Sequence, residues 1–389
     1  MALSATTPVF NPGIAGPAPT PAIEQSILDG MTSGCLIETP EGARLNLSGV
    51  EIGEAEMNAI LWLLNNAQSS LGPLLSLDLS DCPGVSKENI DAIAGVLRNN
   101  SHLTELSFQP PVHERGALTQ IPNDSLRGEQ LAMALTVNTT LTHLCFYGQG
   151  IRDNGALQFA HVLRVNSSLT SLDLGHNGIQ PNAISAIAQA IIANSSLLTL
   201  RMFKNCTGEA YSEIAELISK NSTLMRLNIS ANQIPEQGAI AIGQSLLENS
   251  SLIHLNYFSN EVHDAAALIF AEVIRNNSTL QSLDLAFTGI SDPNATQIAE
   301  ALPFNTTLTR LCIGENTEVV WQNAYPAFAT ALFSNASMTS FDTIETMDDE
   351  SQHLISAHLE RNTLNARNKE ATLLELLWNA NIDFLQNNS

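Results

Sequence analysis

The chain repeats itself with a period of about 28 residues, and a fixed period of this size limits the folds open to it. An apolar residue, leucine or methionine, recurs at ten positions. The ten positions are Leu74, Leu103, Leu141, Leu169, Leu197, Leu224, Leu252, Leu280, Leu308 and Met338. Their spacing is nearly even, apart from one longer step between Leu103 and Leu141. Such a period indicates a stack of equivalent units, none of which can bury its apolar face alone.

Each unit has the pattern of a strand followed by a helix. The strand part reads L-x-x-L-x-L, as in Leu280, Leu283 and Leu285. Three residues later stands a small polar side chain, which we expect to satisfy backbone groups where the strand turns away. This position holds Asn177, Asn205, Asn232, Asn260 and Asn316, with Cys82 and Thr288 in two other units. In the segment that follows, residues such as Ile184, Ile187 and Ile191 fall on one face of a helix.

Each predicted helix ends at an asparagine followed by serine or threonine. These asparagines are Asn166, Asn194, Asn221, Asn249 and Asn305. We expect them to adopt the left-handed conformation that stops a helix. They also match the N-x-S/T acceptor of N-glycosylation. Because they recur at one phase of the repeat, the sequence favours a structural turn.

With these residues, the units resemble the 28-residue repeats of the ribonuclease-inhibitor type of leucine-rich-repeat protein. That class includes ribonuclease inhibitor, Ran GTPase-activating protein and the sensor arms of NOD-like receptors. The resemblance covers roughly residues 42–345. It implies an α/β solenoid, or horseshoe, with parallel strands on the concave face and helices on the convex face. It also implies a protein partner bound at the concave face.

Free-standing arrays of this build are also similar to the effectors that bacterial pathogens such as Legionella deliver into host cells. The resemblance therefore leaves a sensor role and an effector role open. A GTPase-activating or GTPase-docking role, as in Ran GTPase-activating protein, is the alternative function.

Composition narrows the class of partner and the compartment. The formal net charge of −23 disfavours nucleic-acid phosphates and anionic lipid as partners. The five cysteines are scattered without a CxxC pair, so we expect no disulfide or zinc framework and a reducing cytosol, or a host cytosol for an effector. We find no apolar run of membrane-spanning length and no secretory signal at the N-terminus. We expect a monomer, with self-association through exposed aromatics as the alternative.

The organisation that we predict has four parts. They are a disordered proline-rich segment (1–22), an N-terminal cap with a degenerate first repeat (23–73), the repeats (74–345) and a helical C-terminal cap (346–389). The first cap would begin with a short helix near Ile23 to Leu28, and the last would hold two helices. The long step contains an insertion at 109–127. It is either loop decoration or a lobe that adds contacts beside the concave face.

The outward positions of the strands predict the binding surface. Arginine and aromatic side chains carry most binding energy at protein interfaces, and several of them fall on these positions. The predicted partner-binding residues are His143, Tyr147, Arg201, Phe203, Lys204, Arg226, His254, Phe258, Phe287 and Arg310. Tyr147, Phe203 and Phe258 form one column without an evident intrachain reason to face water. Two alternatives stay open: Phe203 and Phe258 stack on neighbours within the sheet, or the patch holds a phosphate.

The sequence does not support catalysis, and we expect no catalytic residue, cofactor or metal site. His143, Cys145 and Asp173 superficially suggest a Cys-His-Asp arrangement. Alternate side chains on a strand lie about 6.6 Å apart, which is beyond direct hydrogen-bond reach. The histidines are dispersed and no phosphate-binding glycine loop is present.

Overall fold

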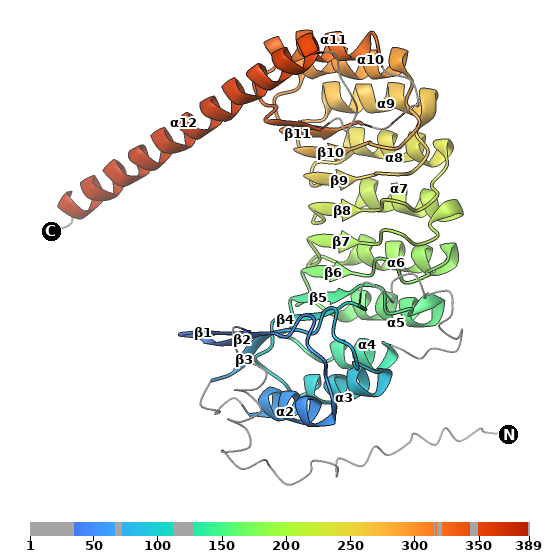
Figure 1. The fold of residues 1–389 in the computed structure, drawn as a ribbon, viewed down its shortest axis with the longest axis vertical. Helices are drawn as coiled ribbons and strands as arrows, with labels where there is room; N and C mark the ends of the chain where they lie inside the picture. The colour runs from blue at the N-terminus through green and yellow to red at the C-terminus, as the bar shows by residue number, and fades with distance from the viewer. Residues whose placement is uncertain are drawn as a thin grey trace.

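The chain forms one sheet whose strands follow each other in sequence order (Figure 1). The computed structural model describes residues 35–66, 72–111, 128–314, 316, 321–342 and 349–387. In these ranges the sheet has 12 strands. They are β1 (Leu36–Thr39), β2 (Gly42–Asn46), β3 (Leu74–Asp78), β4 (Glu105–Phe108), β5 (His143–Phe146), β6 (Ser171–Asp173), β7 (Thr199–Arg201), β8 (Arg226–Asn228), β9 (His254–Asn256), β10 (Ser282–Asp284), β11 (Arg310–Cys312) and β12 (Ser340–Asp342). From β2 onward the pairing is parallel, whereas β1 pairs antiparallel with β2.

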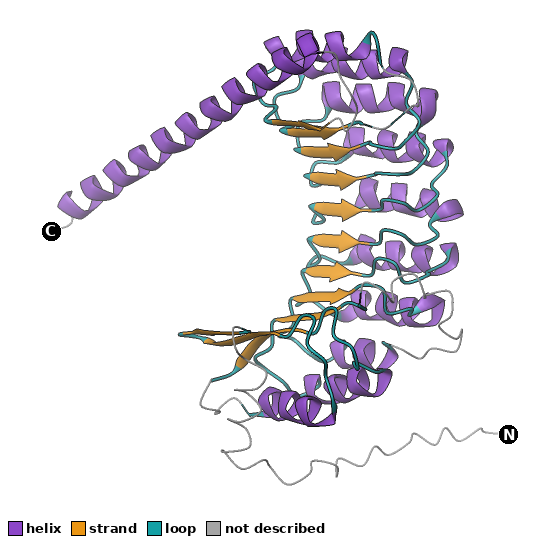
Figure 2. Cartoon of the chain, viewed as in Figure 1, coloured by secondary structure: helices purple, strands orange, loops and turns teal. Residues whose placement is uncertain are grey.

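The helices alternate with the strands along the chain. They are α2 (Glu54–Asn65), α3 (Lys87–Leu97), α4 (Glu129–Leu135), α5 (Arg152–Val165), α6 (Pro181–Ala193), α7 (Tyr211–Lys220), α8 (Glu236–Glu248), α9 (His263–Asn276), α10 (Asp292–Ala301), α11 (Ala324–Ser334) and α12 (Asp349–Asn387), with short 3-10 turns η3 (Gly208–Ala210) and η4 (Leu302–Phe304). The strands line the inner side of a curved array and the helices its outer side (Figure 2). The predicted α/β solenoid, with parallel strands on the concave face and helices on the convex face, is confirmed.

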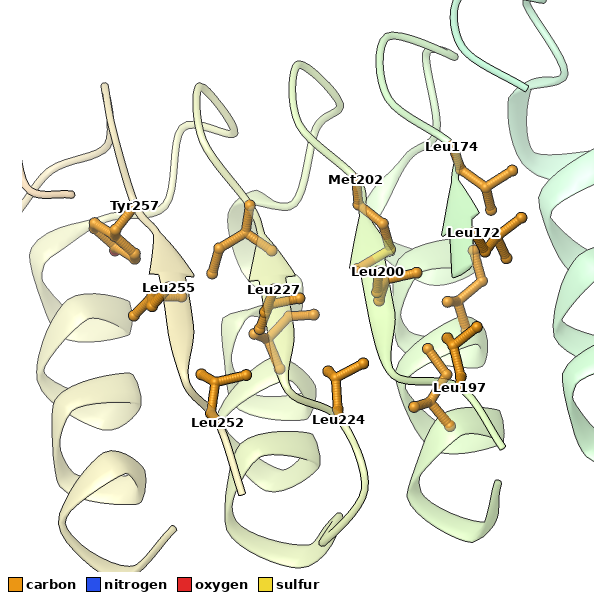
Figure 3. Packing of buried hydrophobic residues seen from close by; sticks show 14 of the residues in the cluster. Leu172, Leu174, Leu197, Leu200, Met202, Leu224, Leu227, Leu252, Leu255 and Tyr257 are labelled. Carbon is orange, nitrogen blue, oxygen red and sulfur yellow. The ribbon is translucent and has the colours of Figure 1, made fainter. Parts of the chain in front are cut away.

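The core lies between the strands and the helices. In one unit Leu197, Leu200 and Met202 are fully buried, and Figure 3 shows the equivalent residues of neighbouring units stacked beside them. From the other side, α6 contributes Ile184 and Ile187, which are also fully buried. Each such side chain contributes roughly 1.5–3 kcal/mol of burial. The apolar periodicity read from the sequence therefore marks the core directly.

The asparagine at each helix end works differently from our prediction. Asn194 has φ −79° and ψ 132°, an extended conformation, so the predicted left-handed helix stop is wrong. Its side chain does the capping instead: Nδ2 donates to Leu163 O at 2.8 Å and Oδ1 accepts from Leu197 N at 2.8 Å. The same pattern recurs at Asn166, Asn221, Asn249, Asn277, Asn305 and Asn335. We call these residues the outer asparagine ladder.

The outer asparagine ladder is buried, with exposed fractions of 2 to 8%. A glycan cannot attach to an amide nitrogen that is enclosed and hydrogen-bonded to the preceding unit. The structural interpretation of the N-x-S/T pattern is therefore the right one for the folded chain.

The polar residue after each strand satisfies backbone groups, as predicted. Asn205 Nδ2 donates to Leu174 O at 3.0 Å and to Met202 O at 2.9 Å. Its Oδ1 accepts from Asn177 N at 3.0 Å, which ties one unit to the next. The hydroxyl of Thr288 donates to Leu285 O in the unit where threonine replaces asparagine.

The two ends of the array differ from a regular repeat. The predicted degenerate first strand is β2, and no pattern in the sequence predicted the β1 strand that forms a hairpin with it. At the other end, one 39-residue helix, α12, stands where we predicted two helices. Its first half closes the array: Ile355 is buried, and Asn362 Nδ2 donates to Asn335 O at 3.0 Å. Beyond that contact the helix leaves the array (Figure 1).

Three predictions fall on residues outside the described ranges. They are the disordered segment 1–22, the short helix near Ile23 to Leu28, and the part of the insertion that spans 112–127.

Candidate partner-binding surface

The concave face presents three columns of side chains, because alternate residues of each strand point away from the core. The strand register aligns the first two columns from strand to strand. The first column holds His143, Ser171, Thr199, Arg226, His254, Ser282 and Arg310. The middle column, two residues later, holds Cys145, Asp173, Arg201, Asn228, Asn256, Asp284 and Cys312. The third column, two residues later again, holds Tyr147, Gly175, Phe203, Ser230, Phe258, Ala286 and Gly314.

Two aromatic side chains of the third column stack across the strand between them. The rings of Tyr147 and Phe203 lie 5.3 Å apart with an interplanar angle of 17°. They meet over Gly175, where a Cβ atom would lie 2.4 Å from Phe203 Cε1. Tyr147 is 8% exposed, and its hydroxyl is 3.2 Å from His176 Nδ1. The expectation that Tyr147 and Phe203 have no intrachain reason for their positions is wrong, because glycine lets one ring support the other.

A second aromatic pair lies further along the array. The ring of Phe258 contacts Phe287 edge to face at 5.1 Å. Phe258 is half-buried, whereas Phe287 is 44% exposed. Phe287 also has φ +56°, the left-handed backbone that Lys204 and Ser259 adopt at the same position of their units, so this conformation belongs to the repeat. This pair leaves an apolar surface open to solvent, and the half-buried ring of Phe203 lies two units away in the same column.

Of the three arginines on the outward positions of β5 to β11, two are already paired with carboxylates. Arg201 Nη1 lies 3.7 Å from Asp173 Oδ2, and Arg310 Nη2 lies 2.6 Å from Asp342 Oδ2. Both arginine side chains remain more than half exposed, so each pair contributes at most about 1 kcal/mol to folding. Burial raises the pKa of Asp173, which the hydrogen bond from Gly175 N and the charge of Arg201 oppose.

Arg226 and His254 are register partners in the first column. Arg226 is exposed, and within the described ranges no carboxylate lies within ion-pair distance of it. His254 is half-buried, and burial, followed by the charge of Arg226, lowers the pKa of its imidazole. His143 and Lys204 are exposed elsewhere on the face, so the predicted residues gather on one surface without forming one contiguous cluster.

Sequence reasoning passed over Asn228 and Asn256 in the middle column. Their signal was present: both strands carry asparagine where β3, β6 and β10 carry aspartate. The exchange removes two negative charges from the centre of the concave face.

The chemistry of the face does not favour a nucleophile. Burial, followed by the charge of Asp173, raises the pKa of the Cys145 thiol to about 11. A thiol of this kind is protonated at neutral pH and reacts slowly. Among the described residues, no three histidine, cysteine, aspartate or glutamate side chains gather closely enough to hold a metal ion. In the same residues, no helix has the length and apolar character needed to cross a membrane.

Comparison with known families agrees with this architecture. A family model for the TMOD/LMOD leucine-rich domain matches residues 117–231, and a leucine-rich-repeat model matches residues 220–243 and 276–298. The fold is a leucine-rich-repeat solenoid. Neither matching model describes an enzyme family, and models of this kind describe protein-binding modules. No curated protein matches the sequence.

Solved leucine-rich-repeat structures are similar at low identity. The leiomodin-1 actin-binding site 2 is 18% identical, with 43% of this chain and 95% of that chain covered and a TM-score of 0.38. A tropomodulin C-terminal domain from Caenorhabditis elegans is 14% identical over 48% and 98% of the two chains, with a TM-score of 0.34. An internalin from Listeria monocytogenes is 16% identical over 83% and 95%, with a TM-score of 0.40.

Proposed function

We propose that this leucine-rich-repeat chain is a non-enzymatic module that binds another protein on its concave face. The observation that carries the proposal is the aromatic surface of Phe203, Phe258 and Phe287. Phe287 is 44% exposed and Phe258 is half-buried beside it, so the two rings leave apolar surface in water. An interface that covers these rings removes that surface from water, and aromatic side chains are frequent anchors of protein interfaces.

The polar residues around this surface specify the partner further. His143, Lys204 and Arg226 are exposed on a chain whose net charge is −23. A partner that presents an apolar protrusion beside acidic side chains complements this arrangement. The same overall charge disfavours nucleic acid and anionic membranes. We expect the free chain to be a monomer.

We also propose that the repeats are of the ribonuclease-inhibitor type and that the chain acts in a cytosol. The register partners from β5 to β11 recur at a nearly constant interval along the chain. A helix follows each of the strands β5 to β10, as this repeat type requires. All five cysteines are free, which suits a reducing compartment. For a bacterial effector that compartment is the host cytosol, and eukaryotic lysate is then the right source of partners.

Affinity capture with paired variants tests the concave site. The test variant is Phe258→Ala with Phe287→Ala. The matched control is Phe304→Ala with Phe333→Ala, which removes two rings that are 62% and 69% exposed on the helical side. We expect wild type and the control to retain a specific protein. The test variant should retain at least tenfold less of that protein. Equal retention by all three forms would place the partner elsewhere.

A second candidate is docking on a small GTPase with acceleration of GTP hydrolysis. The observation in its favour is Arg226, an exposed guanidinium without an ion pair in the described ranges. An arginine supplied in trans accelerates hydrolysis by roughly 10³–10⁵. The assay is single-turnover hydrolysis by candidate GTPases with wild type and with Arg226→Ala. Acceleration that the substitution abolishes would move the proposal from a binding module to a GTPase activator.

A further inference from the structure

Several units end their strand in the same local turn, in which a middle-column side chain caps the backbone. Asp78 Oδ1 accepts from Ser80 N at 2.9 Å, and Asp173 and Asp284 make the equivalent bonds at 2.8 and 3.1 Å. In β8 and β9 the cap is an asparagine. Asn228 Oδ1 accepts from Ser230 N at 3.0 Å, and Asn256 Oδ1 accepts from Phe258 N at 3.1 Å.

Asparagine in place of aspartate replaces one carboxylate oxygen, which accepts hydrogen bonds, by an Nδ2 group, which donates them. A backbone N–H donates to an oxygen and not to an amide NH₂, so the cap fixes the orientation of both side-chain amides. The oxygen of each faces the turn, and the Nδ2 group is left for the concave side. Within the described residues, neither Nδ2 group donates to another protein group, and both side chains are half-buried. Two neighbouring strands thus offer donors that the fold does not use.

A guanidinium and an imidazole stand beside these donors. Arg226 precedes Asn228 on β8, and His254 precedes Asn256 on β9. The outward positions of β8 and β9 carry no carboxylate, although the whole chain has 39 acidic residues against 16 basic ones. The nearest acid in register is Asp284 on β10, whose Oδ1 is occupied by Ala286 N and which lies near Arg310. The outward side of β8 and β9 is therefore rich in donors, and Asp284 is the carboxylate that lies in register beside Asn256.

We propose that Arg226, Asn228, His254 and Asn256 form a carboxylate-binding site that takes an acidic side chain of the partner protein. The inference rests on the proposed function and adds the chemistry of the central contact. Neighbouring strands lie about 4.8 Å apart, so donors from β8 and β9 can reach one carboxylate together. A guanidinium supplies charge-assisted, bidentate hydrogen bonds to a carboxylate, and the amides add neutral ones. Phe258 follows Asn256 by two residues, so the partner carries an apolar side chain next to the acid.

Fluorescence anisotropy with defined peptides tests the site. The probe is a labelled short peptide with four glutamates and two leucines, and its counterpart carries glutamine at the same positions. The test variants are Arg226→Ala and the double variant Asn228→Asp with Asn256→Asp. Aspartate already caps β3, β6 and β10, so the double variant retains the turn while it restores two charges. The matched control is Asn46→Asp on β2, where Asn46 Oδ1 caps Ser48 N at 2.9 Å outside the site.

We expect the glutamate peptide to bind wild type at least tenfold more tightly than the glutamine peptide. Arg226→Ala should weaken it at least fivefold and the double aspartate variant at least tenfold, while Asn46→Asp changes it less than twofold. Equal binding of the two peptides, no binding at millimolar concentration, or equal loss in the control would each overturn the site. If a single-stranded DNA oligomer binds more tightly than the glutamate peptide through the same residues, the ligand of the site is a nucleic-acid phosphate and not a protein carboxylate.

The outcome is separable from that of the proposed function. A partner captured through Phe258 and Phe287, together with a failed peptide assay, would leave the binding module in place and remove the carboxylate site. A peptide assay that succeeds while no partner is captured through Phe258 and Phe287 would support the carboxylate site and would contradict the proposed aromatic binding surface.

Discussion

Replacement of one residue of the outer asparagine ladder should destabilise the whole array. We take Asn194→Ala, because Asn194 lies in the middle of the repeats and is 8% exposed. Its side chain holds two units together and caps the strand that follows. Nδ2 donates to Leu163 O at 2.8 Å and Asn166 O at 3.2 Å, and Oδ1 accepts from Ser196 N at 3.0 Å and Leu197 N at 2.8 Å.

The magnitude follows from the groups that lose their partners. Alanine can make none of these four hydrogen bonds, and the groups left behind are enclosed by the neighbouring units. A buried polar group without a partner costs about 1–3 kcal/mol. Some of the four groups will find water, so we expect a loss of about 3 kcal/mol in the free energy of unfolding. That is a large part of the roughly 5–15 kcal/mol typical of a folded domain.

The assay is urea denaturation followed by circular dichroism. The matched control is Asn182→Ala, which removes an exposed asparagine of the adjacent helix α6. We expect a lower midpoint for Asn194→Ala and a reduced slope, since loss of one interface uncouples the halves of a repeat array. A loss below about 1 kcal/mol, or one equal to that of Asn182→Ala, would refute the assignment of the ladder as a stabilising device.

Four further predictions concern the surface, the thiols and the C-terminal end. Gly175→Ala should lower the free energy of unfolding by about 1–3 kcal/mol and displace Phe203, because the new Cβ would lie 2.4 Å from Phe203 Cε1. Unchanged thermal stability and unchanged near-ultraviolet circular dichroism from Tyr147 would contradict the stacked pair. Cys145 and Cys312 should resist alkylation at pH 8, because burial raises their thiol pKa values to about 11 and about 12. Their alkylation rate should rise about tenfold per pH unit from pH 8 until the pH approaches these pKa values, and rapid labelling at pH 8 in the native state would argue against the burial. Since these folded-state pKa values exceed the ordinary value of 9.0, the stability that the two thiols contribute is present below pH 9 and is lost as the pH rises towards 11 and 12; calorimetry across that range measures the loss. Asn362→Ala should lower the melting temperature by several degrees, whereas the exposed Asn365→Ala should not; equal effects would mean that α12 does not continue the ladder.

The candidate surface could be predicted only in part from the sequence. The alternation of apolar and outward residues located the three columns, and the positions of Arg201, Arg226 and Phe258 follow from counting within a unit. Whether an outward residue is exposed did not follow. Tyr147 is buried because Phe203, two units further along the array, covers it. Gly175 in the unit between them leaves room for the two rings. Asn228 and Asn256 could have been singled out by aligning the units, since β3, β6 and β10 carry aspartate at the same position.

The sequence by itself determined the solenoid, because the repeat period puts the same apolar residues into the core of every unit and leaves stacking as the one way to bury them. It also located the asparagine at which helices such as α5, α6 and α7 end. Only the tertiary structure decided how that asparagine works. Its amide reaches carbonyl groups of the preceding unit, as Asn194 reaches Asn166 and Leu163, and such partners exist only once two units are stacked. Local conformational preference favoured a left-handed residue at that point, and the hydrogen bonds between units override it.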